Sequence, residues 1–249
     1  MALDEKNLTG SLVEFILDGS SVKANKEETI WQVANRLGLK IPYLCWKDSP
    51  GYRADGNCRA CMVEIEGERT LAASCLRKPT SGMKVITHNN RVEKNRKLVF
   101  ELLQSDMPER TESPDPNSHF WEQVQAIGGE AKNRFPSSRP GTAKRIPVES
   151  IFHDASHTSI AVNLDACITC GLCERACKEV QVNDVIGMGN RGADTKPIFD
   201  FSDPMGFSSC VACGECIQAC PTGALMEKSL LNSDATKREV FPEKVIDSI

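Results

Sequence analysis

The sequence has 249 residues, of which 40% are hydrophobic and 6% aromatic, and its formal net charge is −4. This length allows one large domain or two to three small ones, and the acidic balance argues against nucleic acid as a partner. The twelve cysteines occur in tight clusters and the N-terminus lacks the apolar region of a signal peptide, so we expect metal sites in a reducing cytoplasm. No stretch approaches about 18 apolar residues, which predicts no membrane span.

The first elements predict a β-grasp unit. Residues 12–17 alternate weakly and are followed by Asp18-Gly19, which is a hairpin signal, and residues 20–24 form the expected return strand. Thr29 is the expected N-cap of a helix that Gly38 ends. Trp31 on this helix is interpreted as a core residue.

Four cysteines follow with the spacing C-x12-C-x2-C-x13-C. A [2Fe–2S] cluster needs four thiolates and a backbone that can approach the sulfides, and Gly51 and Gly56 permit that approach. The alternative is zinc, because all-cysteine sites also bind zinc. The predicted ligands are Cys45, Cys58, Cys61 and Cys75.

The flanks of these cysteines carry a pattern of their own. It reads Ile-Pro-Tyr-Leu-Cys at 41–45, Gly-Asn-Cys-Arg-Ala-Cys-Met-Val-Glu at 56–64, Ala-Ser-Cys at 73–75 and Gly-Met-Lys-Val at 82–85. These stretches resemble the N-terminal [2Fe–2S] domain shared by the large iron–sulfur subunit of respiratory complex I, NAD-reducing hydrogenases and NAD-dependent formate dehydrogenases. The resemblance implies the same cluster here.

Residues 89–150 are predicted to connect two cluster domains and to pack against both. A basic amphipathic helix is expected over 91–103, with Val92, Leu98, Val99, Leu102 and Leu103 as its apolar residues. In the family this helix leads into a His-Pro-x-x-Cys segment and a Cys-x2-Cys pair that hold a further [4Fe–4S] cluster. Here no cysteine occurs from 76 to 166, so we predict that this cluster is absent. The histidines are interpreted as surface or loop residues: His88, His119, His153 and His157.

Two cysteine runs dominate residues 151–228. Cys167–Cys177 and Cys210–Cys220 both read C-x2-C-x2-C-x3-C, and Pro221 follows the second run. This is the bacterial ferredoxin pattern for two [4Fe–4S] clusters, in which the fourth cysteine of each run binds the other cluster. Zinc is again the alternative. The predicted ligand sets are Cys167, Cys170, Cys173 and Cys220 for the first cluster, and Cys177, Cys210, Cys213 and Cys216 for the second.

The expected fold class is therefore α+β, with a β-grasp [2Fe–2S] ferredoxin domain followed by a bacterial-type 2×[4Fe–4S] ferredoxin domain. The expected boundaries are 1–88 for the first domain, 89–150 for the connecting region, 151–228 for the second domain and 229–249 for a C-terminal linker. The expected cofactors are one [2Fe–2S] and two [4Fe–4S] clusters.

Further stretches narrow the resemblance: Cys177–Gly187, Asp203–Gly206 leading into Cys210–Cys216, and the tail Lys244–Ile249. They resemble the α subunit of soluble NAD-dependent formate dehydrogenases, in which the tail precedes a molybdenum or tungsten domain. In that family a C-x2-C motif for another cluster comes next. The chain is therefore expected to be the product of a split gene or a piece of a larger subunit.

No Gly-rich nucleotide fingerprint, P-loop or catalytic triad is evident, so we predict that the chain moves electrons and has no catalytic residue of its own. The resemblance implies a cytoplasmic NAD-dependent formate dehydrogenase. Its partners would be a Mo/W-bis-pterin catalytic subunit and an FMN/NAD-binding diaphorase subunit. The alternatives are the iron–sulfur subunit of an NAD-reducing hydrogenase, a free ferredoxin-like shuttle, and a zinc-structured interaction protein.

Overall fold

The computed structural model describes residues 12–129, 135 and 154–232. The chain divides into two compact units, the first comprising residues 1–102 and 123–132 and the second residues 103–122 and 133–249. The tail Lys244–Ile249 and His153 lie outside the described residues. None of the helices in the described part of the chain is long and apolar enough to cross a membrane.

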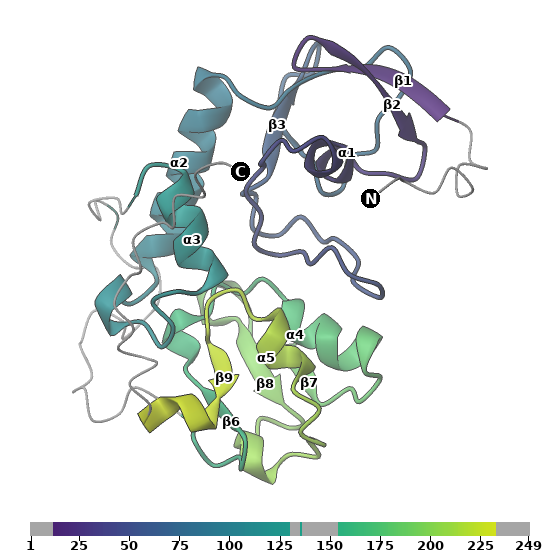
Figure 1. Cartoon of the computed structure of the whole chain (residues 1–249). Helices are drawn as coiled ribbons and strands as arrows, with labels where there is room; N and C mark the ends of the chain where they lie inside the picture. The colour runs from purple at the N-terminus through teal and green to yellow at the C-terminus, as the bar shows by residue number, and fades with distance from the viewer. Residues whose placement is uncertain (1–11, 130–134, 136–153, 233–249) are drawn as a thin grey trace, which may run out of the picture. The chain divides into compact units, whose positions relative to one another are not determined.

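A five-stranded mixed sheet forms the first unit (Figure 1), in the order β2-β1-β5-β3-β4. Strand β1 pairs antiparallel with β2 and parallel with β5. The β1–β2 turn at Asp18 and Gly19 has positive φ at both residues, as a two-residue hairpin requires. The strands are β1 (Leu12–Leu17), β2 (Ser20–Asn25), β3 (Met62–Ile65), β4 (Ala72–Ala73) and β5 (Lys84–Ile86).

Helix α1 (Ile30–Arg36) begins with a capping box. The Gln32 backbone N–H donates to the Thr29 hydroxyl at 3.3 Å, and the Thr29 N–H donates to the Gln32 side chain at 3.0 Å. The buried face of α1 packs into the core of the unit, which also contains Phe15, Val63 and Val85. The predicted start of this helix is therefore confirmed.

Trp31 links α1 to the segment that precedes the first cysteine. It is 4% exposed, and its indole Nε1 donates to the Ile41 carbonyl at 2.9 Å. Its ring meets the rings of Tyr43 and Trp46 edge-on, with centroids 4.8 and 4.7 Å away. The interpretation of Trp31 as a core residue is confirmed, and the ring cluster holds the backbone on both sides of Cys45.

Two helices follow, α2 (Asn90–Ser105) and α3 (His119–Ala126). The buried stripe of α2 in the first unit differs from the apolar set expected from the sequence. It contains Val92, Arg96 and Phe100 at a spacing of four residues, whereas Leu98 and Leu102 are exposed. A buried guanidinium therefore stands where helical periodicity would place an apolar side chain.

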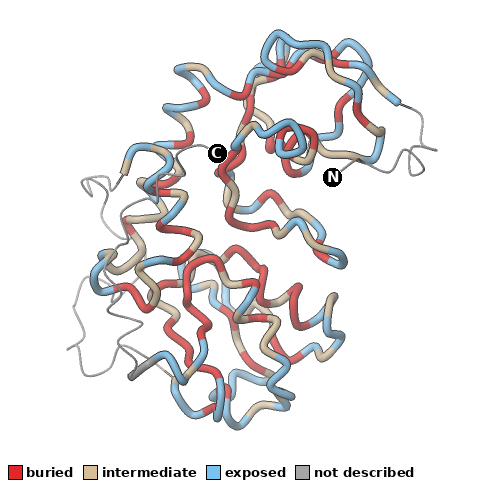
Figure 2. Tube along the Cα trace, viewed as in Figure 1, coloured by how far each residue is buried: buried red, intermediate tan, exposed pale blue. Residues whose placement is uncertain are grey.

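The second unit contains two antiparallel pairs, β6 (Ile160–Val162) with β9 (Leu225–Glu227) and β7 (Ile186–Gly189) with β8 (Lys196–Phe199). The β7–β8 hairpin occupies the segment between the two cysteine runs. The short helices α4 (Leu172–Arg175) and α5 (Glu215–Ala219) each follow the second cysteine of a run. Figure 2 shows buried residues concentrated along these strands and helices.

Part of the connecting region packs behind the second cysteine run, within the second unit. The Phe120 N–H donates to the Pro221 carbonyl at 2.8 Å. Asp115 lies against Gly223, where an added Cβ would be 2.6 Å from the Asp115 Cβ. This contact fixes the backbone that follows Cys220.

The histidines differ in their environments. His88 is exposed and His119 is half-buried, as expected of surface or loop residues. His157 lies in a loop, which agrees with the expectation, but it is only 6% exposed. Its Nδ1 accepts hydrogen bonds from the Ser159 and Ile160 backbone N–H groups, both at 3.1 Å, and these bonds satisfy the buried ring nitrogen.

Candidate metal centres

The first unit gathers Cys45, Cys58, Cys61 and Cys75. All but Cys58 are buried, and Cys58 is intermediate. Cys61 immediately precedes β3, and its carbonyl accepts the Ser74 backbone N–H at 3.2 Å and the Ser74 hydroxyl at 2.7 Å. These bonds join the loop of the second and third cysteines to the segment that ends in the fourth.

The four thiols of this unit interact with one another. Hydrogen bonds from the Cys58 and Cys75 thiols hold the pKa of Cys45 well below its usual range, and the same contacts raise the pKa of both donors. A hydrogen bond from Cys75 lowers the pKa of Cys61 to about 7, against the opposing effect of burial. Thiolates are the form that binds metal. Two members of the set are thus prepared to act as ligands at neutral pH.

In the described residues of the second unit, each of two cavities is lined by four cysteines. One cavity, with about 370 Å³ of space partly open to solvent, is lined by the first three cysteines of the first run and the last of the second. The other, with about 310 Å³, is lined by the remaining four. The runs therefore cross over. The first set is Cys167, Cys170, Cys173 and Cys220, and the second is Cys177, Cys210, Cys213 and Cys216.

The same local geometry presents a sulfur in all three cysteine loops. In each loop, the backbone N–H two residues after the first cysteine donates to that cysteine's Sγ. The pairs are Ala60 to Cys58 at 3.5 Å, Thr169 to Cys167 at 3.3 Å and Ala212 to Cys210 at 3.4 Å. Each loop contains a non-glycine residue with positive φ: Arg59, Thr169 and Ala212. Such N–H···S bonds stabilise negative charge on sulfur.

Two further donors reach the cavity that contains Cys177. The Val185 N–H donates to the Cys177 Sγ at 3.3 Å, and the Asn183 side-chain amide donates to the Cys213 Sγ at 3.8 Å. Both residues lie just before β7. Their roles depend on how the segment between the runs folds, and the cysteine pattern contains no signal for them.

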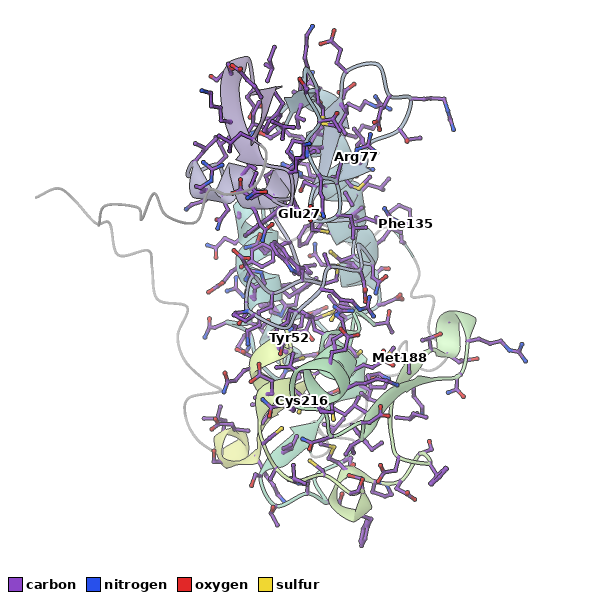
Figure 3. The ribbon with its side chains drawn as sticks, turned by 90° about the vertical axis from the view of Figure 1, so that its right-hand side faces the viewer. Glu27, Tyr52, Arg77, Phe135, Met188 and Cys216 are labelled. Atoms are coloured by element: carbon purple, nitrogen blue, oxygen red, sulfur yellow. The ribbon has the colours of Figure 1, made fainter. Side chains whose placement is uncertain are left out.

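The two cavities differ in the exposure of their cysteines. Cys170 and Cys173 are buried, whereas Cys213 is exposed. Burial, reinforced by neighbouring thiolates, raises the pKa of Cys173 well above its usual range and that of Cys216 to about 12. Cys216, at the second position of α5, is labelled in Figure 3. These thiols must lose their protons when a metal binds.

No three His, Cys, Asp or Glu side chains in the described residues are grouped closely enough to hold a single metal ion. In the second unit the cysteines instead surround cavities, so the chemistry of the donor sets fits a group with several metal atoms and four thiolate positions. In the first unit the thiols of Cys45, Cys58, Cys61 and Cys75 shift one another's pKa values, which is consistent with a shared four-thiolate site.

Comparison with known families identifies both units. Residues 10–90 match the 2Fe-2S iron-sulfur cluster binding domain, and residues 156–224 match the 4Fe-4S dicluster domain. The chain therefore carries a domain of the first type followed by a domain of the second type. The expected fold class is thereby confirmed, with a [2Fe–2S] ferredoxin-type domain followed by a [4Fe–4S] domain.

Relatives of this iron–sulfur protein belong to larger oxidoreductases. It is 31% identical over 95% of its length to the HndD component of the NADP-reducing hydrogenase of Solidesulfovibrio fructosivorans, and spans 39% of that protein. It is 32% identical over 86% of its length to a G-type NADH-quinone oxidoreductase component of Rhizobium meliloti (strain 1021), and spans 24% of it. A chain in the crystal structure of an NAD+-reducing [NiFe]-hydrogenase in the H2-reduced state matches with a TM-score of 0.73 and 27% identity, over 87% of this chain and 88% of that one.

Proposed function

We propose that this chain is the iron–sulfur electron-transfer subunit of a cytoplasmic NAD-dependent formate dehydrogenase. The observation that supports electron transfer most directly is the pair of cavities with crossed sets of four cysteines. When bound, a [2Fe–2S] cluster at Cys45, Cys58, Cys61 and Cys75 and a [4Fe–4S] cluster in each cavity would take up and release single electrons.

The chain's own residues would set the spacing and potentials of these centres. Backbone N–H groups donate to four sulfurs, and apolar side chains of the second unit's core, including Val185, Ile186 and Met205, line one cavity. Hydrogen bonds to sulfur and exclusion of water are the means by which a protein adjusts such potentials. No residue is assigned to bond-breaking chemistry.

The formate assignment rests on four sequence stretches: Cys177–Gly187, Asp203–Gly206, Cys210–Cys216 and Lys244–Ile249. A Mo/W-bis-pterin subunit would oxidise formate, and an FMN/NAD-binding diaphorase subunit would receive the electrons. The chain spans well under half of the curated relatives described above, so these partners could be separate chains or further domains of a larger protein.

The iron–sulfur subunit of an NAD-reducing hydrogenase is the second candidate. The relatives named as hydrogenase components favour it, and they match over 95% and 87% of this chain. Against it stands the stretch from 76 to 166, which lacks the cysteines of the additional cluster normally kept in that family. A free shuttle is less favoured, because it needs no connecting region of this length.

Anaerobic purification from native cells, followed by metal analysis of the associated chains, tests the proposal. Molybdenum or tungsten with a pterin, together with formate-dependent NAD reduction, is the expected result. A nickel–iron partner would establish the hydrogenase reading, and elution as a single small chain would establish the shuttle. For the chain itself we expect about ten irons; a colourless, zinc-containing product would reject any redox role.

A further inference from the structure

A buried arginine of the first unit contacts the residue that follows Cys61. Arg96, on α2, is 4% exposed, and its Nη2 donates to the Met62 carbonyl at 2.9 Å. Met62 directly follows Cys61. The Arg96 Nε is buried, and it has no hydrogen-bond partner among the described residues. A guanidinium in this position retains a donor for which the described protein atoms supply no acceptor.

Among the negative groups that act on the Arg96 guanidinium, Cys61 has the strongest effect. Burial lowers the pKa of this guanidinium, whereas the negative charges of Cys61, Glu93 and Asp18 raise it, with Cys61 the strongest of the three. Glu93 is exposed, and the Asp18 carboxylate accepts the Thr87 N–H at 2.7 Å and the Thr87 hydroxyl at 2.5 Å. No ion pair joins Arg96 to a carboxylate within the described parts of the chain.

A buried cation requires a nearby anion, because taking an unpaired charge out of water is costly. Four thiolates around an oxidised [2Fe–2S] core would carry a net charge of about −2, and one added electron makes it about −3. A fixed positive charge close to this group stabilises the more negative state to a greater extent. The predicted effect of Arg96 is therefore a higher reduction potential.

We propose that Arg96 is a positioning residue for the [2Fe–2S] centre, whose buried positive charge raises the reduction potential of that centre and whose hydrogen bond to Met62 holds the Cys58–Cys61 loop. The inference rests on the [2Fe–2S] assignment of the proposed function and is independent of the formate partner. The step affected is the one-electron reduction of the [2Fe–2S] core, in which an electron from an external reductant lowers the core charge from 2+ to 1+.

The test is an anaerobic redox titration of the full, cluster-loaded chain with dithionite, followed by EPR. In the Arg96→Gln variant we expect the equilibrium constant for one-electron reduction of the [2Fe–2S] centre to fall at least tenfold, which corresponds to about 59 mV. The [4Fe–4S] signals of the same sample serve as an internal reference and should not move. Lys94→Gln removes one positive charge from an exposed position on the same helix and should leave the midpoint unchanged.

Equal shifts in the Arg96→Gln and Lys94→Gln variants, or no shift in a loaded Arg96→Gln variant, would overturn the inference. If Arg96→Gln does not load, Arg96→Lys decides, because it retains the charge on an amine whose pKa burial can lower. We expect its midpoint to equal the wild-type value near neutral pH and to fall as pH rises, while the wild-type value stays constant. A midpoint in Arg96→Lys that lies at least about 59 mV below the wild-type value near neutral pH would refute the role of charge. A wild-type chain without a [2Fe–2S] signal would instead refute the cluster assignment.

Discussion

The crossed ligand sets can be tested by removing one sulfur, and Cys177 is the most informative choice. It belongs to the first run by sequence, but it lines the cavity of the second, where it is 7% exposed and accepts the Val185 N–H at 3.3 Å. The Cys177→Ala variant therefore removes a ligand from the second set without providing an oxygen in its place. The cluster of the second run should be lost.

The expected magnitude follows from counting. One [2Fe–2S] and two [4Fe–4S] clusters contain about ten irons, so loss of one four-iron cluster leaves about six. Iron analysis gives this number but does not show which cluster remains. EPR of the reduced protein identifies the remaining [4Fe–4S] cluster, because each centre has its own spectrum and midpoint potential.

Two matched controls make the result decisive. Cys213→Ala removes a ligand that belongs to the second set under any assignment, and Cys170→Ala does the same for the first set. We expect the surviving signal of Cys177→Ala to coincide with that of Cys213→Ala. If the surviving signal of Cys177→Ala instead coincides with that of Cys170→Ala, each run binds its own cluster, and the crossed arrangement is refuted.

Three further predictions concern stability and assembly. Gly206→Ala would place a Cβ 2.4 Å from the Ser156 carbonyl carbon, so we expect the free energy of unfolding, measured by thermal denaturation, to fall by about 1 to 3 kcal/mol. In the control Gly187→Ala the added Cβ meets nothing within 4 Å, so this variant should be nearly as stable as the wild type. Thr29→Ala removes the N-cap of α1 and should cost about 1 kcal/mol in the same assay; no change would show that the cap is unimportant. Burial raises the pKa of Cys216 to about 12, so metal uptake by the second unit must release protons there, and cluster reconstitution in this unit should improve from about pH 6.5 to 8.5; a yield independent of pH would contradict the reasoning.

The sequence by itself determined which residues are candidate ligands and how they are divided. Two C-x2-C-x2-C-x3-C runs imply crossing of the fourth cysteine, since three closely spaced thiolates occupy one loop and the fourth lies on the following turn. The β-grasp order was also predictable, because the hairpin at Asp18-Gly19 and the cap at Thr29 are local signals. These features depend on neighbours in the chain, and short-range patterns record them directly.

Only the tertiary structure decided what surrounds the sulfurs. Asn183 and Val185 reach their sulfurs because the segment before β7 folds back over the second run. Arg96 is buried because α2 turns that side of the helix towards the first residue of β3, although its sequence reads as an exposed basic position. Such contacts join residues 8 to 34 positions apart in the chain, and no local pattern specifies them. Burial and long-range contact, which set the charge and hydrogen bonding at each centre, arise from packing and not from spacing.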